Sequence, residues 1–278
     1  MTSSVRRLVA ATITVVLAAV APDPAFGFTP KTRAEVVRKA VTLMPATLQR
    51  QLRRHAKALY GGALEGTTEA EGHASHAYDP GSADDRLADA MASLTSSVGE
   101  RRPMREIVRE FGRVGHTATD LAFALNVGPD DPREPGFYAD FSRYVERSLP
   151  KIRVTFEGFA DADLRRGDIE AFADRIAASA RRDYEGILRS YHPDGRASTT
   201  QDFDDRSVAF ASASLEFSLA VTATARAWLY AWHSANGDLA GAPLFGTAGA
   251  HDPFAAAPAG ETSAAAGTRS SDKQEGKR

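Results

Sequence analysis

The chain has 278 residues, of which 43% are apolar and 25% charged, so it can bury the core of one large domain or of two smaller ones. Its formal net charge of −2 argues against a protein that grips long nucleic acids through their phosphates, because such proteins carry a basic excess. The absence of cysteine excludes disulfides, thiol catalysis and cysteine-ligated zinc. Any metal site must therefore use histidines and carboxylates.

The first 27 residues have the pattern of a secretory leader. Two arginines precede an uncharged apolar run over residues 8–21, and Ala25 and Gly27 are small residues at the two positions that signal peptidase reads. A membrane anchor is the alternative, but the apolar run is shorter than the roughly 20 residues that a membrane span requires. We predict cleavage after Gly27, a secreted or periplasmic location, and a mature chain without a transmembrane segment.

The rest of the chain predicts helices and almost no strands, because apolar residues recur with helical spacing among Ala, Arg, Glu and Leu. Residues 61–81 and 129–136 are rich in Gly or Pro and predict loops. We expect an all-α domain over residues 28–242 and a disordered tail over 243–278, which is rich in small residues. The predicted helices cover approximately 30–44, 45–60, 82–97, 103–127, 137–149, 168–190 and 203–234.

Two of these helices have informative ends or faces. Thr29 and Pro30 form a favourable helix start, with a capping hydroxyl followed by a proline in the first turn. The helix predicted over 203–234 is apolar on several faces, which indicates a central position in the fold.

The strongest chemical signal is a histidine four residues before an aspartate. His116 and Asp120 lie in a predicted helix, and this spacing places an imidazole and a carboxylate on one helical face, where they can share a divalent ion. A surface or capping pair is the alternative for an isolated His-x-x-x-Asp. However, His116 falls in the apolar register of its helix, and a buried pair needs a partner or a metal. A further candidate ligand, His76, lies in the long loop over residues 61–81.

Three segments resemble the family of zinc-dependent phospholipase C and P1 nuclease. Residues 111–120, FGRVGHTATD, resemble the family helix that supplies a His and, four residues later, an Asp. Residues 75–80, SHAYDP, resemble the family's Ser-His-Phe-Tyr-Asp-Pro, whose His ligates zinc. Residues 135–145, PGFYADFSRYV, resemble the segment that supplies a further His and a Glu. The three segments keep the family's order within residues 28–150, so the resemblance implies a multi-helix phospholipase C-like domain.

Carried over residue by residue, the resemblance implies one zinc site formed by His76, His116 and Asp120. A carboxylate of the preceding loop would act as the fourth ligand or as the catalytic base. Glu65 is our first choice for it, with Glu69 and Glu71 as alternatives.

The two other zinc sites of the family lack their ligands in this sequence. The amino-terminal residue of the predicted mature chain is Phe28 rather than the family's tryptophan. The positions that correspond to metal-binding side chains hold Arg33, Asn126, Tyr138 and Ser142. The resemblance thus implies one zinc ion where the family has three.

These observations lead to two alternative functions. The first is an exported, zinc-dependent hydrolase of phosphate esters, similar to phospholipase C, which acts on a phospholipid or another small phosphodiester; nucleic acid is a less suitable substrate because the chain has no basic excess. The second is a non-catalytic relative that binds a metal or another ligand in the cell envelope, which the missing ligands favour.

Overall fold

The computed structural model describes residues 27–65, 83–129, 131–193 and 198–240. Within these ranges the chain forms helices and no strand, which confirms the all-α class. The predicted leader, most of the long loop and the predicted tail lie outside the described residues.

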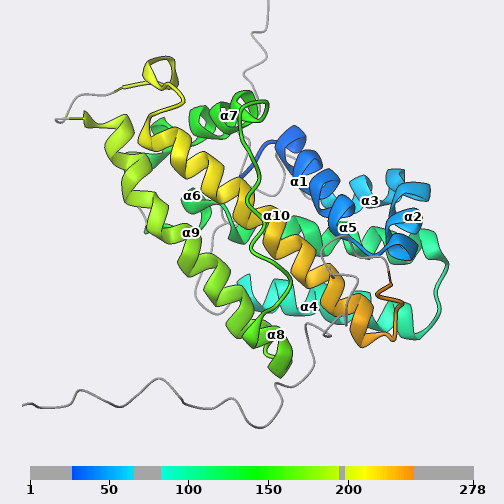
Figure 1. Ribbon diagram of the computed structural model, residues 1–278. Coiled ribbons are helices and arrows are strands. Elements are labelled where there is room, and N and C mark those ends of the chain that lie inside the picture. Colours follow the sequence, from blue (N-terminus) through cyan, green and yellow to red (C-terminus); the bar gives the residue numbers. More distant parts are fainter. Residues whose placement is uncertain (1–26, 66–82, 130, 194–197, 241–278) are drawn as a thin grey trace, which may run out of the picture.

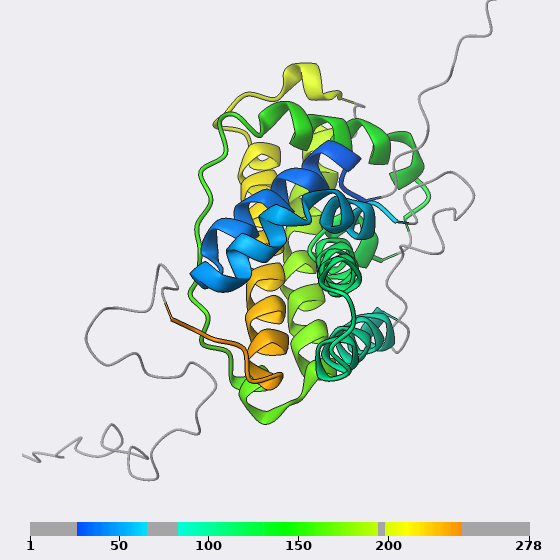
Figure 2. The same cartoon turned by 90° about the vertical axis from the view of Figure 1, so that its right-hand side faces the viewer.

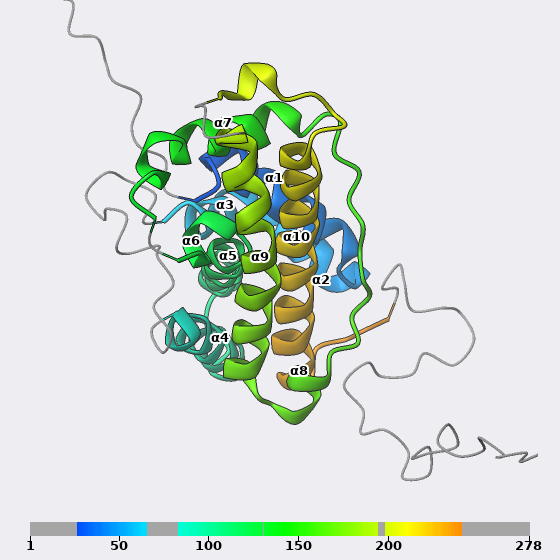
Figure 3. The same ribbon diagram turned by 90° about the vertical axis from the view of Figure 1, so that its left-hand side faces the viewer.

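The helices form a bundle around two long, neighbouring helices, α9 and α10 (Figures 1 and 3). Helix α10 packs against α1, α4, α5, α7 and α9, and Figure 2 shows α1 crossing in front of it. In chain order the elements are α1 (Pro30–Leu43), α2 (Ala46–Arg54), α3 (Ala56–Ala63), α4 (Ala83–Gly99), α5 (Met104–Leu121), α6 (Ala124–Val127), the 3-10 helix η3 (Glu134–Gly136), α7 (Tyr138–Ser148), α8 (Ala162–Arg166), α9 (Ile169–Tyr191), η5 (Thr200–Asp202) and α10 (Val208–Ser234).

Helix α10 occupies the centre of the fold, as its sequence predicts. Trp228 is fully buried, and its indole N–H donates a hydrogen bond of 2.7 Å to the carbonyl oxygen of Phe111 on α5. Gly115 allows this close approach, since a Cβ atom there would lie 3.3 Å from the Trp228 ring. Among the described helices, α10 alone has the length and hydropathy of a membrane span, but 67% of its apolar window is buried inside the fold, as in the core helix of a soluble protein.

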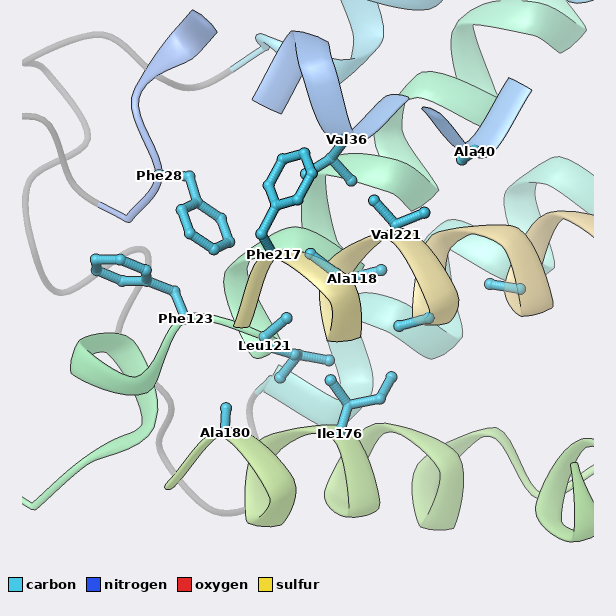
Figure 4. Close-up of a cluster of buried hydrophobic side chains, with 14 of the residues drawn as sticks. Phe28, Val36, Ala40, Ala118, Leu121, Phe123, Ile176, Ala180, Phe217 and Val221 are labelled. Carbon is cyan, nitrogen blue, oxygen red and sulfur yellow. The ribbon is translucent and has the colours of Figure 1, made fainter. Parts of the chain in front are cut away.

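Two predicted helices are interrupted in the structure. The segment predicted over 45–60 divides at His55 into α2 and α3, and the segment predicted over 103–127 divides into α5 and α6. The second break occurs because Phe123 adopts an extended backbone conformation, which turns its ring towards Phe28, with ring centroids 4.8 Å apart (Figure 4). Packing against a residue distant in sequence thus overrides the local helical pattern.

Helix α1 begins as predicted and orients one polar side chain inward. The Thr29 hydroxyl accepts a hydrogen bond of 3.2 Å from the Thr32 amide and caps the helix. The buried face of α1 then includes Arg33, Val36 and Ala40, at helical spacing. An arginine therefore enters the interior on the same face as the apolar residues that Figure 4 shows in the core.

One carboxylate lies inside the helical core. Glu216 on α10 is completely buried, and within the described residues neither of its carboxylate oxygens makes a well-formed hydrogen bond. Burial, and next the negative charge of Asp183 on α9, raise the pKa of Glu216 well above its ordinary value, while the nearby Ala124 amide opposes this shift. Burial likewise raises the pKa of Asp183 to about 6.

Because both pKa values are raised, the folded chain binds these protons more tightly than the unfolded chain does. Stability from this pair is therefore greatest below the unfolded pKa of about 4 and is lost as the pH rises towards the folded pKa values. Glu216→Gln, which stays neutral, should raise the melting temperature by several degrees at pH 8 and by much less at pH 5, as measured by thermal denaturation. Glu185→Gln, at an exposed position on α9, is the control and should change neither value. Parallel pH profiles for the wild type and Glu216→Gln would contradict this account.

Candidate functional site

Polar side chains gather where the first turn of α1 meets the end of α5, the short helix α6 and the start of α7. The break between α5 and α6 brings residues from both helices to this place. The members of this polar cluster are Gly27, Arg33, His116, Asp120, Asn126, Tyr138 and Ser142.

His116 and Asp120 face one another on α5. His116 Nε2 lies 3.1 Å from Asp120 Oδ2, and His116 Nδ1 lies 3.1 Å from the carbonyl oxygen of Ala63 at the end of α3. Carbonyl and carboxylate oxygens can only accept, so a hydrogen bond to Ala63 requires a proton on Nδ1 and one to Asp120 requires a proton on Nε2. The imidazole is thereby held with Nε2 directed towards the carboxylate.

Arg33 places a positive charge on the same carboxylate. Its side chain is 1% exposed, and its guanidinium forms an ion pair with Asp120 Oδ1. The guanidinium also donates from Nε to the Phe28 carbonyl oxygen at 3.0 Å, and Nη1 lies 3.5 Å from His116 Nδ1. Asp120 is thus held between a guanidinium and an imidazole.

Asn126, Tyr138 and Ser142, which the resemblance places at the other two zinc sites, form one connected hydrogen-bond chain. The Tyr138 hydroxyl donates to Asn126 Oδ1, and Asn126 Nδ2 donates to the Asp120 carbonyl oxygen at 3.1 Å. The Gly27 amide donates to the Tyr138 hydroxyl, and the Ser142 hydroxyl donates to the Gly27 carbonyl oxygen at 2.7 Å. Each of these three side chains therefore makes a hydrogen bond with the backbone of the chain.

Of the other two predicted ligands, the structure describes Glu65 alone, and it places Glu65 outside this cluster. His76 lies outside them, so its role stays a prediction. Glu65 forms ion pairs with Arg109 at 3.1 Å and Arg113 at 2.9 Å on the surface. Hydrogen bonding to Arg113, and next to Arg109, lowers the pKa of Glu65 to about 2 although partial burial opposes it.

The arrangement of the described residues does not fit a metal ion. Nowhere among them do three His, Asp or Glu side chains converge closely enough to hold one. At Asp120 the carboxylate is already neutralised by a buried guanidinium, and a second cation there would be repelled. The zinc ion expected from the sequence therefore finds one histidine and one aspartate, with Arg33 in contact with both.

One feature of the sequence points to the buried ion pair, namely an arginine on the apolar face of a predicted helix. Arg33 shares the inward face of its helix with Val36, Val37 and Ala40, so an inward arginine is predictable. Its partner is not predictable from the sequence, because Asp120 lies on another helix. The burial of Glu216 is not predictable from periodicity either, because its helix is apolar on several sides and no single face is marked as the inward one.

Comparison with known proteins supports the fold alone. The sequence matches no protein-family profile and none of the curated proteins. Among solved structures, the crystal structure of Clostridium perfringens alpha-toxin isolated from an avian strain is similar, with a TM-score of 0.55 and 12% sequence identity. The similarity covers 78% of this chain and 66% of that chain, just under two thirds of it. At this identity it shows a distant relationship in fold, and the all-helical class is the one that the sequence predicts.

Removing the guanidinium of Arg33 should destabilise the folded chain, because the buried carboxylate of Asp120 would lose its counterion. Arg33→Met keeps the apolar stem but leaves the buried carboxylate without its cation, so the free energy of unfolding should fall by about 3–5 kcal/mol in urea denaturation. The double variant Arg33→Met/Asp120→Asn should recover part of this loss, because its carboxamide is neutral. Arg38→Met, at a half-exposed position on the same helix, should change stability by less than about 1 kcal/mol. An Arg33→Met protein as stable as the wild type would contradict the ion pair.

Proposed function

We propose that this chain is an exported phospholipase C-like protein that binds a phosphate-bearing ligand without hydrolysing it. The observation that carries this proposal is the buried ion pair between Arg33 and Asp120. This pair lies at the position where the resemblance implies a zinc site. The guanidinium of Arg33 supplies the positive charge there that a metal would otherwise supply.

A guanidinium cannot take over the chemistry of a metal. A catalytic zinc ion keeps an open coordination position and lowers the pKa of a bound water to about 7. Arginine has donors only, stays protonated and activates no water. In addition, Tyr138 and Ser142 are engaged with the Gly27 backbone, so the positions of the second family site are occupied by hydrogen bonds.

The predicted catalytic base also has unsuitable properties. A general base works best when its pKa lies near the operating pH. The pKa of Glu65 is lowered to about 2 by Arg113 and Arg109, so its carboxylate is a weak proton acceptor at neutral pH. This argues against Glu65 as a base in the described arrangement.

The class of ligand follows from resemblance rather than from the site. The three sequence segments similar to zinc-dependent phospholipase C, together with the fold likeness to alpha-toxin, favour a phospholipid or another small phosphodiester. The formal net charge of −2 disfavours a long nucleic acid. Export to the cell envelope or medium rests on the leader pattern of residues 1–27.

A zinc-dependent hydrolase is the second candidate, and one observation favours it. His116 is oriented by a hydrogen bond from Nδ1 to the Ala63 carbonyl, the kind of support that metal-binding histidines commonly have. This candidate requires Arg33 to leave Asp120, and it requires His76 as a further ligand. It predicts one zinc ion per chain, and the binding protein predicts none.

Three measurements on the exported protein, purified without chelators, separate the candidates. We expect far less than one zinc per chain by elemental analysis and no hydrolysis of a chromogenic phosphodiester or of phosphatidylcholine. We also expect the protein to sediment with phosphatidylcholine vesicles. One zinc per chain together with hydrolysis would establish the hydrolase instead, provided that His116→Ala removes both and Glu65→Gln slows turnover while keeping the metal.

Arg33→His provides the matched variant. It removes the buried guanidinium and supplies an imidazole beside His116 and Asp120, so zinc should raise the melting temperature of this variant and not that of the wild type. An equal zinc response in both proteins would show that Arg33 does not exclude the metal.

A further inference from the structure

The chain immediately before α1 is part of the folded interior. Gly27 is buried, Phe28 is 1% exposed and Thr29 is 5% exposed. The Phe28 ring points into the core beside Phe123, as Figure 4 shows. This segment therefore packs like core structure rather than like the start of a loop.

Both peptide groups of Gly27 are bound by side chains of α7. The Gly27 amide donates to the Tyr138 hydroxyl, and its carbonyl oxygen accepts from the Ser142 hydroxyl at 2.7 Å. Tyr138 and Ser142 lie one helical turn apart on α7, and both are buried. The next carbonyl oxygen, of Phe28, accepts from Arg33 Nε at 3.0 Å. Three side chains thus hold two consecutive residues by their backbone.

The backbone conformation and the close packing at position 27 both require glycine. Its φ of +75° lies in the left-handed region, which L-residues with a side chain rarely adopt. A Cβ atom there would lie 2.7 Å from Arg33 Nη2, 3.1 Å from Asn126 Nδ2 and 3.2 Å from Asp120 Oδ1. Gly27 therefore packs directly against the side chains of the polar cluster, with no room for a side chain of its own.

From this geometry we infer that Gly27 remains on the mature chain, so that any leader is removed upstream of it; the inference rests on the proposed export. Hydrolysis of the bond between Gly27 and Phe28 would add one water, release a Gly27 carboxylate and leave an ammonium on Phe28. The chain that remains would lack the amide that donates to Tyr138 and the carbonyl that accepts from Ser142.

Cleavage upstream of Gly27 avoids these losses. A Gly27 amino terminus still donates to the Tyr138 hydroxyl and keeps its carbonyl oxygen for Ser142. The small residues at Ala25 and Gly27 favour the bond after Gly27, whereas the packing of the folded chain favours an earlier bond.

The amino terminus of the exported protein tests this inference directly. The full chain is produced in an export-competent bacterium, and the extracytoplasmic protein is analysed by intact mass and amino-terminal sequencing. A terminus at Gly27 or upstream is expected, and a terminus at Phe28 or downstream overturns the inference. A chain that keeps all of residues 1–27 and stays with the cells would support the retention of Gly27 while refuting the proposed export.

A substitution tests the structural reason independently. Gly27→Ala keeps small residues at both positions that signal peptidase reads, but its Cβ would meet the Arg33 guanidinium, so a melting temperature several degrees lower is expected. Gly61→Ala is the control, since nothing lies within 4 Å of a Cβ there and its stability should be unchanged or slightly higher. Equal melting temperatures for Gly27→Ala and the wild type would overturn the inference. If Gly27→Ala yields no folded protein, the amino-terminal residue of the exported wild-type protein still decides whether Gly27 is retained.

Discussion

A buried ion pair is stable only when both charges are fixed by further hydrogen bonds, because neither can be solvated by water. In this protein the pair of Arg33 and Asp120 joins the first turn of α1 to the end of α5. The Phe28 carbonyl holds the guanidinium from one side, and His116 holds the carboxylate from the other. This constraint fixes where α1 starts relative to α5, and it neutralises the buried carboxylate of the polar cluster.

Within the described residues, the polar groups of this cluster are satisfied by one another and by the backbone. Asn126, Tyr138 and Ser142 have neutral side chains, and each finds a partner in the backbone of Gly27 or Asp120. Buried polar groups are thereby satisfied without an ion. A fold can host different chemistry when its site residues change, which is consistent with a fold similar to that of alpha-toxin at 12% identity.

The other buried charges of the fold differ in how they are compensated. Asp161, which caps α8, is fully buried and accepts from Arg175 at 2.6 Å, and Arg226 of α10 lies 3.4 Å from it. These pairs tie the segment before α8 to α9 and α10. Glu216 has no comparable cation among the described residues and instead lies near Asp183, so burial favours its protonated form. Ion pairs thus stabilise two places in the bundle, whereas this carboxylate makes its stability depend on pH.

The amino-acid sequence by itself determined the all-helical class, the capped start of α1, the central position of α10 and the common face of His116 and Asp120. These features depend on local periodicity and on residues a few positions apart. The tertiary structure decided what the sequence left open: the break at Phe123, the partner of Arg33 and the surface ion pairs of Glu65. Each depends on residues from different helices that only the folded chain brings together, because an inward arginine and a distant aspartate neutralise each other only when the packing of α1 against α5 places them in contact.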